Sequence, residues 1–192
     1  PALEPFSRLE QSKAVLLAKG SGVLCFDECL SGSWRELAEL ARALPTPCPV
    51  VQGCASTTVE LRGEGDVTHE LASQDAQAIY TYFEHLRVLK ATQTLAQLPV
   101  ALCPPTPLAG SQTVVTPVAG VLVFIAQLGQ CLKPGDVVAE VVNPITGQVH
   151  AVCAEVEGIY YARVKDCYAK ANDEIANIAG RIAFKTGNLL GA

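Results

Sequence analysis

The sequence predicts an α/β segment followed by an all-β domain. In residues 1–92, apolar residues recur at helical spacing on both sides of one strand-like run. Residues 93–110 contain Pro99, Pro104, Pro105 and Pro107, a composition typical of a semi-rigid connector. In residues 111–192, short β-branched runs alternate with turn residues, as in all-β domains. The predicted organisation is therefore an α/β part, a proline-rich linker and a β domain with these boundaries.

Length, composition and charge are those of an ordinary globular protein. The chain has 192 residues, of which 49% are hydrophobic and 17% charged. A formal net charge of −5 disfavours nucleic acid or an anionic membrane surface as a partner. No run approaches the roughly 18 apolar residues of a membrane span, and charges interrupt the opening segment where a signal peptide would lie. We therefore expect a cytoplasmic protein.

The cysteines and histidines do not form a metal-binding pattern. None of the 8 cysteines has a C-x-x-C partner, and most lie among apolar neighbours. These features predict reduced, buried cysteines rather than a disulfide framework or a zinc ribbon. His69, His85 and His150 lack H-E-x-x-H and H-x-x-E spacing. The chain therefore carries no recognisable metal motif of its own.

Three helices are predicted in the α/β part. The first lies within residues 4–18. The second follows a capping box, Ser33-Trp34-Arg35-Glu36, in which the serine hydroxyl and the glutamate satisfy each other's backbone amides. Pro45 ends its apolar pattern, which consists of Leu37, Leu40, Ala41 and Leu44.

The third helix is expected from about Ser73 to Leu89, after a polar loop over Glu64–Glu70. Asp75 near its start and His85 or Arg87 near its end suit the helix dipole. We expect His85 to be an exposed residue of the last turn rather than a ligand. The predicted buried stripe consists of Ala76, Ile79, Tyr80, Phe83 and Leu86.

Between the second and third helices lies a short strand, Ala55–Gly63, whose two faces are unequal. Val59 and Leu61 point one way, whereas Glu60 and Arg62 point the other, because side chains alternate along a strand. A carboxylate in such a run is unfavourable unless it is paired, solvated or used. The pattern leaves two interpretations open. Either Glu60 and Arg62 form a surface pair on a wet edge strand, or Glu60 is a catalytic carboxylate at a strand end.

The β domain is predicted to contain six strands separated by turns. Turn sequences occur at Lys133–Asp136, which contains Pro-Gly-Asp, and at Asn143–Gly147, which contains Asn-Pro. The predicted strands are Gln112–Pro117, Gly120–Ala126, Val137–Val142, Val149–Ala154, Gly158–Arg163 and Glu174–Ile178.

This domain contains an internal repeat. In each half a strand that begins at a glycine (Gly120 or Gly158) precedes an Asp-containing turn and a further strand. The second copy has Asn172 where the first has Gly135, and asparagine is the next best residue for a left-handed turn position. The repeat resembles the barrel-sandwich hybrid of biotinyl and lipoyl carrier domains. Those carriers present a modified lysine on the hairpin between the two halves. The corresponding hairpin here, Asn143–Gly147, contains no lysine, so the group that a carrier would need is missing.

The order of these parts resembles the C-terminal portion of the succinylglutamate desuccinylase/aspartoacylase family. The resemblance extends from Phe26 to the end of the chain. It implies a fold class in which an α/β fragment, the C-terminal part of a zinc-carboxypeptidase-like catalytic domain, precedes an all-β, barrel-sandwich-hybrid-like domain. The stretches that carry it are Phe26–Glu28 with Ser33–Leu37, Thr57–Gly63 with Asp66-Val67, Pro107–Ser111 and Gly187–Leu190.

The resemblance implies a zinc-dependent hydrolase that cleaves the amide bond of a small N-acyl amino acid. In that family an H-x-x-E stretch and a later histidine hold one zinc ion, and a glutamate on a late strand works on the metal-bound water. Glu60 corresponds to that glutamate. Arg62 is a candidate for substrate binding or for a structural ion pair. Tyr160 and Tyr161 are candidates for reaching the cleft or for packing in the β domain.

The zinc ligands of the family are absent from this sequence, so the resemblance implies a fragment that is inactive alone. The lack of methionine fits a chain that begins partway through a longer protein, or one whose initiator was removed. A non-catalytic binding or assembly protein that uses the β domain for interaction is the main alternative. A peptide-cleaving carboxypeptidase is a third, disfavoured by the appended β domain. A homo-oligomer is left open.

Overall fold

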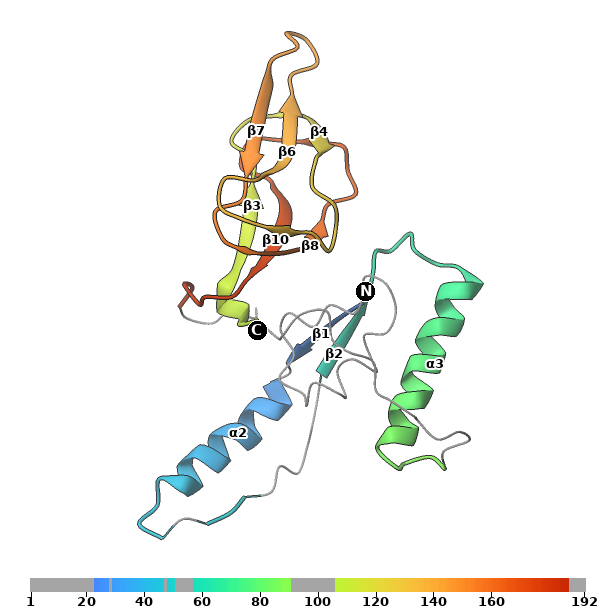
Figure 1. The fold of residues 1–192 in the computed structure, drawn as a ribbon, viewed down its shortest axis with the longest axis vertical. Helices are drawn as coiled ribbons and strands as arrows, with labels where there is room; N and C mark the ends of the chain where they lie inside the picture. Colours follow the sequence, from blue (N-terminus) through green and yellow to red (C-terminus); the bar gives the residue numbers. More distant parts are fainter. Residues whose placement is uncertain (1–22, 28, 47, 51–56, 91–105, 187–192) are drawn as a thin grey trace. The chain divides into compact units, whose positions relative to one another are not determined.

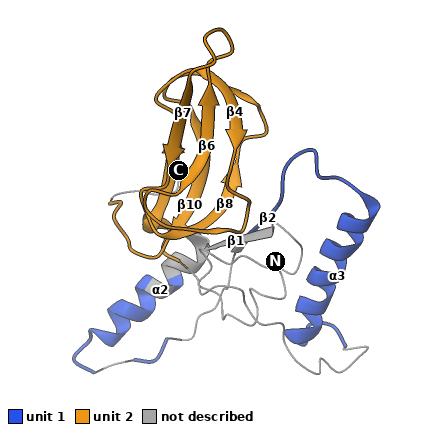
Figure 2. Cartoon of the chain, turned by 45° about the horizontal axis from the view of Figure 1, so that its top comes forward, with its two compact units in different colours: residues 1–105 blue, residues 106–192 orange. Residues whose placement is uncertain are grey.

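The computed structural model describes residues 23–27, 29–46, 48–50, 57–90 and 106–186. The helix predicted within residues 4–18 and most of the predicted connector lie outside these ranges. The chain divides into two compact units, Pro1–Pro105 and Thr106–Ala192 (Figure 2). This division falls inside the predicted connector.

The described part of the first unit contains two strands and two helices (Figure 1). Strand β2 (Thr57–Leu61) confirms the predicted strand. It pairs antiparallel with β1 (Val23–Asp27), which was not predicted. Helix α2 (Cys29–Arg42) separates the two strands in the sequence, so their pairing is not a local hairpin. Val23 to Phe26 are all apolar, so β1 lacks the alternation of apolar and polar residues that indicates a half-buried strand.

The predicted start of α2 is wrong. The helix begins at Cys29, upstream of the proposed capping residue Ser33, which therefore lies inside the helix. The predicted end is confirmed, since α2 stops at Arg42 and the Ala43 N–H still donates to the Glu39 carbonyl at 3.1 Å. Pro45 follows, as expected for a residue that cannot continue a helix. The capping-box sequence was compatible with helix interior as well as with a helix start.

Helix α3 spans His69–His85, so both predicted boundaries are displaced. Its start is fixed by Thr68, which has extended backbone angles and accepts a hydrogen bond from the Leu71 N–H on its Oγ1 at 3.2 Å. A threonine in this position satisfies one of the free amides of the first turn. His69 and Glu70 therefore belong to the helix rather than to the predicted loop. At the other end, the Leu86 N–H donates to the Tyr82 carbonyl at 3.0 Å.

The predicted buried stripe of α3 is wrong as well. Four of its members remain 37–42% exposed, namely Ile79, Tyr80, Phe83 and Leu86. The buried residues of this helix are Ala78 and Glu84. On α2, Ala41 is buried but Leu40 is 68% exposed. In its described part, this unit has a sheet of two strands, which is too narrow to cover the apolar faces of two helices.

The second unit confirms all six predicted strands to within a few residues. Two very short strands, β5 (Cys131–Leu132) and β9 (Tyr168–Ala169), and the 3₁₀ helix η1 (Leu108–Gly110) were not predicted. Elements of two or three residues are too short to show a periodicity. The six confirmed strands are β3 (Ser111–Val115), β4 (Gly120–Phe124), β6 (Val137–Val142), β7 (Val149–Cys153), β8 (Gly158–Arg163) and β10 (Glu174–Gly180).

The strands of the second unit form two four-stranded sheets with matching orders, β3-β10-β8-β5 and β7-β6-β4-β9. All their pairings are antiparallel. Exchanging β4 with β8, β5 with β9, β6 with β10 and β7 with β3 converts one order into the other. Side chains of both sheets build one core, whose largest fully buried members are Tyr160, Leu132, Ile175 and Ile178.

The turns of the two halves confirm the internal repeat. Gly135 has a φ of 93° and its counterpart Asn172 a φ of 69°, so both occupy the left-handed region, as predicted. The next residue caps each turn with its carboxylate. Asp136 accepts from the Lys133 N–H at 2.8 Å, and Asp173 accepts from the Lys170 N–H at 2.7 Å.

The glycines that open β4 and β8 are required by close backbone approach. A Cβ atom on Gly120 would lie 2.6 Å from the Val142 carbonyl oxygen. A Cβ atom on Gly158 would lie 2.4 Å from the Ala179 carbonyl oxygen. Val142 of β6 pairs with Val121, and Ala179 of β10 pairs with Ile159, the residues that follow the two glycines, so the same constraint acts in both halves of the repeat.

The prediction of buried cysteines is wrong for the four whose environments are described. Cys48, Cys131, Cys153 and Cys167 are free thiols, as predicted, but all four are exposed. Cys153 shows the reason, because its apolar neighbours Val152 and Ala154 are buried while the alternating strand turns Cys153 outward. Neither described helix has the length and apolar character required to cross a bilayer.

Candidate functional site

The candidate site of the first unit is the end of β2 and its connection to α3. Glu60 lies on β2 opposite Leu24 of β1 in the antiparallel register. Its side chain is exposed, whereas that of Val59, on the other face, is partly buried. The structure therefore places the Glu60 carboxylate on a solvent-accessible face of a paired strand. A carboxylate in this position is within reach of water and of a molecule bound at this face.

Arg62 does not continue the alternation that would keep it on the face of Glu60. It follows the last strand residue and has a φ of 56°, in the left-handed region. Its guanidinium forms an ion pair with Asp75 of α3. The two side chains are 10% and 12% exposed, respectively. Arg62 thereby links the end of β2, which carries Glu60, to the second turn of α3.

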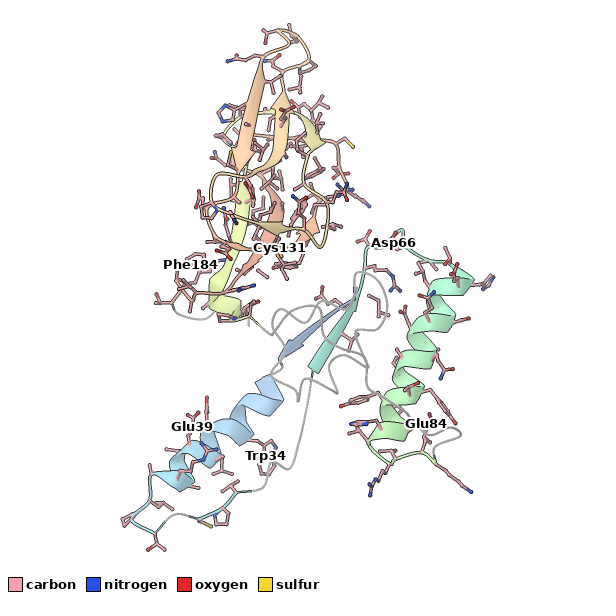
Figure 3. The ribbon with its side chains drawn as sticks, viewed as in Figure 1. Trp34, Glu39, Asp66, Glu84, Cys131 and Phe184 are labelled. Carbon is pink, nitrogen blue, oxygen red and sulfur yellow. The ribbon has the colours of Figure 1, made fainter. Side chains whose placement is uncertain are left out.

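The loop between Arg62 and α3 is a tight, hydrogen-bonded turn. The Gly63 N–H donates to the Asp66 carboxylate at 3.1 Å, and the Asp66 N–H donates back to the Gly63 carbonyl at 3.0 Å. Figure 3 labels Asp66 in this connection between β2 and α3. With the Thr68 cap that follows, the turn fixes the path of the chain from β2 into α3.

The sequence did not reveal the partnership of Arg62 with Asp75. The two residues are 13 positions apart, and Asp75 was interpreted only as a favourable charge near a helix start. The Gly63-to-Asp66 turn and the Thr68 cap, in contrast, have recognisable signals. In both, a polar side chain accepts a hydrogen bond from a backbone N–H three residues away in the sequence.

Tyr160 and Tyr161, the two candidates in the β domain, have different environments. Tyr160 is fully buried in the core of the second unit. Burial raises the pKa of its hydroxyl from 10.0 to about 12, and the nearby positive charge of Arg163 acts in the opposite direction. Tyr161 is partly buried, with its hydroxyl 3.0 Å from the Ser111 hydroxyl. Both contacts lie within the β domain.

The described residues do not fit a zinc site. Over these parts of the chain, no three His, Cys, Asp or Glu side chains are grouped closely enough to hold a metal ion. A catalytic zinc ion generally takes three protein ligands. We therefore assign no zinc ligand among the described residues.

Comparison with known proteins finds similarity at the level of the fold. No family model and no curated protein sequence matches the chain. Solved structures do match. A succinylglutamate desuccinylase/aspartoacylase structure from Shewanella frigidimarina aligns with a TM-score of 0.62 and 17% identity, over 78% of this chain and 40% of that one. A family member from Shewanella amazonensis aligns with a TM-score of 0.59 and 18% identity, over 76% and 40%.

A third solved structure, with a different title, shows the same likeness of fold. The ectoine utilization protein EutE (DoeB) of Ruegeria pomeroyi aligns with a TM-score of 0.52 and 22% identity, over 64% of this chain and 37% of that one. The chain thus spans about 40% of the length of the first solved structures that it matches. The resemblance inferred from the sequence is confirmed as a likeness of fold: in the described residues, few helices accompany mainly antiparallel sheets, matching part of the succinylglutamate desuccinylase/aspartoacylase fold.

Proposed function

We propose that this chain is the C-terminal part of a hydrolase that cleaves the amide bond of a small N-acyl amino acid. The observation that carries the proposal is the likeness of fold to desuccinylase/aspartoacylase structures. The exposed Glu60 on β2 supplies the carboxylate that the chemistry needs. The β unit, with its twofold repeat, is proposed to be the barrel-sandwich-like domain that follows the catalytic domain in such an enzyme.

In this proposal Glu60 transfers the protons of the hydrolysis. Its carboxylate accepts a proton from the water whose oxygen adds to the amide carbonyl. The C–N bond of the tetrahedral adduct then breaks, and the protonated Glu60 returns that proton to the leaving nitrogen. The products are a carboxylic acid, which then releases its remaining proton to solvent, and a free amine, and Glu60 ends in its starting state. One carboxylate serves both steps if it lies within hydrogen-bond distance of the water and the leaving group.

The proposed cofactor is zinc, which would polarise the carbonyl and activate the water. We propose that its ligands come from a part of the protein outside this chain, because the sequence contains no H-x-x-E stretch. The chain alone is accordingly expected to be inactive. Arg62 is proposed to act by position, since its ion pair with Asp75 holds the turn that follows Glu60. Direct contact between Arg62 and the substrate is the less favoured role.

The test uses the full product of the gene that encodes this chain. Glu60→Gln keeps the size and polarity of the side chain but removes the base. We expect turnover of N-acetyl and N-succinyl amino acids to fall by roughly 100-fold or more, with zinc content and KM little changed. The matched control is Glu157→Gln, at an exposed glutamate of the β unit, which should leave turnover unchanged. Equal turnover of Glu60→Gln and wild type would remove Glu60 from the mechanism.

A non-catalytic binding or assembly protein is the second candidate. It is favoured by one observation, the uncharged and exposed edge of the β unit at β7, where Val149 is 52% exposed. This candidate predicts that the full gene product binds a protein partner and lacks amide hydrolysis. Detection of Glu60-dependent hydrolysis would exclude it as the main function.

A further inference from the structure

Each helix of the first unit carries a row of apolar side chains that remains exposed. The α2 row, on α2 and just after it, consists of Leu37, Leu40 and Leu44, which are 47%, 68% and 53% exposed. The large residues of the α3 row are Ile79, Phe83 and Leu86, which are 42%, 41% and 37% exposed. Single exposed apolar side chains are common on proteins, but side chains gathered in rows indicate a contact surface.

The α3 row is continuous along one side of its helix. Its members follow one another at spacings of four, three, four and three residues, namely Ala72, Ala76, Ile79, Phe83 and Leu86. The side that is buried or partly buried within the first unit is a different one, made of Leu71, Asp75, Ala78 and Tyr82. α3 therefore has two sides suited to contact, whereas a helix on the surface of a complete domain typically has one apolar stripe.

The polar residues of α3 are segregated from its row. The Gln74 side-chain amide donates to the Glu70 carboxylate at 3.4 Å, and the Gln77 side-chain amide donates to the Thr81 hydroxyl at 3.2 Å. These residues lie one turn apart on the side of α3 opposite the row. On α2, the exposed residues Glu36 and Glu39 likewise lie away from the leucines. Each helix thus has a separate side for water, and its apolar row is not part of that side.

The exposed rows occur in the unit that has the smaller core. Among its described residues, the buried hydrophobic side chains of the first unit are Ala41 and Ala78, whereas the β unit fully buries Tyr160, Leu132 and Ile175. In the same described part, β1 and β2 pair only with each other. A sheet of two strands is marginally stable without further packing. Over its described residues, the first unit therefore lacks an apolar layer that would cover α2 and α3.

The comparison with solved structures indicates the source of this layer. The match with the Shewanella frigidimarina structure covers 78% of this chain but 40% of that one, so more than half of that chain lies outside the match. A covering layer within one polypeptide has a high effective concentration next to the surface that it covers, which a separate partner lacks. A second copy of this chain would bring the same two-stranded sheet and the same exposed rows rather than a new layer.

We propose that the part of the protein encoded upstream of Pro1 packs on the α2 row and the α3 row and adds strands to the β1–β2 sheet. The inference rests on the proposed function, in which this chain is the C-terminal part of a longer protein. Helices of α/β domains bury their apolar sides against a sheet, which the added strands would widen. Because the Arg62–Asp75 ion pair joins β2 to α3, the contact also fixes the strand of Glu60 against the upstream part.

Ile79→Lys tests the contact by thermal unfolding of the full gene product. Lysine is a good helix former, so the substitution keeps α3 but places a charge in the proposed contact. The unfolding midpoint of the full product should fall by at least about 5 °C. Gln77→Lys, on the polar side of the same helix, is the matched control and should shift the midpoint by less than about 2 °C. In the 192-residue chain both variants should unfold within about 2 °C of wild type, because both positions are exposed there.

Leu40→Ala tests the α2 row and replaces Ile79→Lys if that variant does not fold. It should lower the midpoint of the full product but not that of the 192-residue chain, because truncation is costly only where the side chain is buried. Full-product variants that unfold like wild type would overturn the inference. So would an equal loss in the 192-residue chain, since the rows would then be covered within it. A dimer of the 192-residue chain that Ile79→Lys dissociates, measured by sedimentation velocity, would assign the rows to a second copy instead.

The turnover of Glu60→Gln separates this inference from the proposed function. If substitutions in both rows are tolerated in a full product with Glu60-dependent hydrolysis, the inference alone is overturned. If the midpoints fall as expected in a full product without amide hydrolysis, the contact is supported and the proposed function alone is overturned. A gene product that begins at Pro1 would overturn both.

Discussion

At the scale of single residues, the structure has a part-buried ion pair in the first unit and a buried hydroxyl in the second. Arg62 and Asp75 join β2 to α3 in the first unit. Tyr160 places a hydroxyl in the core of the second unit, where no hydrogen-bond partner satisfies it among the described residues. The ion pair fixes the position of β2 against α3. A buried hydroxyl that makes no hydrogen bond lowers the free energy of unfolding.

Asp75→Asn should destabilise the first unit. It removes a charge partner of a guanidinium that is only 10% exposed. Breaking a fully buried ion pair costs about 3–5 kcal/mol, and this pair is part-buried, so we expect a loss of about 2–4 kcal/mol. The fluorescence of Trp34, which lies in α2, reports unfolding of this unit in urea. Glu39→Gln, at an exposed position of α2, should change the free energy of unfolding by less than about 0.5 kcal/mol. Equal stabilities of the two variants would show that the ion pair does not hold β2 to α3.

The raised pKa of Tyr160 predicts a pH dependence of stability. Below pH 10 the hydroxyl is protonated in the folded and the unfolded chain. Between pH 10 and pH 12 the unfolded chain loses this proton first, because burial raises the folded pKa from 10.0 to about 12. The free energy of unfolding should therefore fall as the pH rises through this window.

Tyr160→Phe should lessen that fall, whereas Tyr168→Phe, at a residue 57% exposed, should not. Urea unfolding of both variants and wild type at several pH values in the window measures the difference. A slope in Tyr160→Phe identical to that of wild type would contradict the proposed burial of the hydroxyl.

At the scale of elements, the β repeat was the most predictable part of the chain. Its strands alternate regularly, and Gly135 and Asn172 mark turns whose backbone angles few residues tolerate. β1 and the boundaries of α2 and α3 were less predictable. The Ser33 capping sequence occurs inside α2, and the true cap of α3, Thr68, competes with several polar neighbours.

The repeat makes a paired prediction about its glycines. Gly158→Ala should destabilise the β unit by at least about 2 kcal/mol, because its Cβ would meet the Ala179 carbonyl oxygen at 2.4 Å. Gly135→Asn should change stability by less than about 1 kcal/mol, because Asn172 occupies the equivalent left-handed position. Thermal unfolding of both variants tests the pair. A tolerated Gly158→Ala, or a severely destabilising Gly135→Asn, would contradict the equivalence of the two halves.

At the scale of the whole molecule, the sequence indicated the fold but only part of the candidate site. Glu60 could be singled out because a carboxylate stands among apolar, β-branched residues of a short strand. The Arg62–Asp75 pair could not, because no pattern relates a residue after a strand to one in a later helix. The chain also spans about 40% of the length of the first solved structures that it resembles. Site residues that lie in the remaining part of such structures cannot be predicted from this sequence.

The measurement that tests the central claim most directly is the sequence of the messenger RNA upstream of the codon for Pro1. If this chain is the C-terminal part of a zinc-dependent deacylase, the same reading frame encodes an H-x-x-E stretch and a later histidine before Pro1. An upstream frame without these residues, or a start codon immediately before Pro1, would contradict the account.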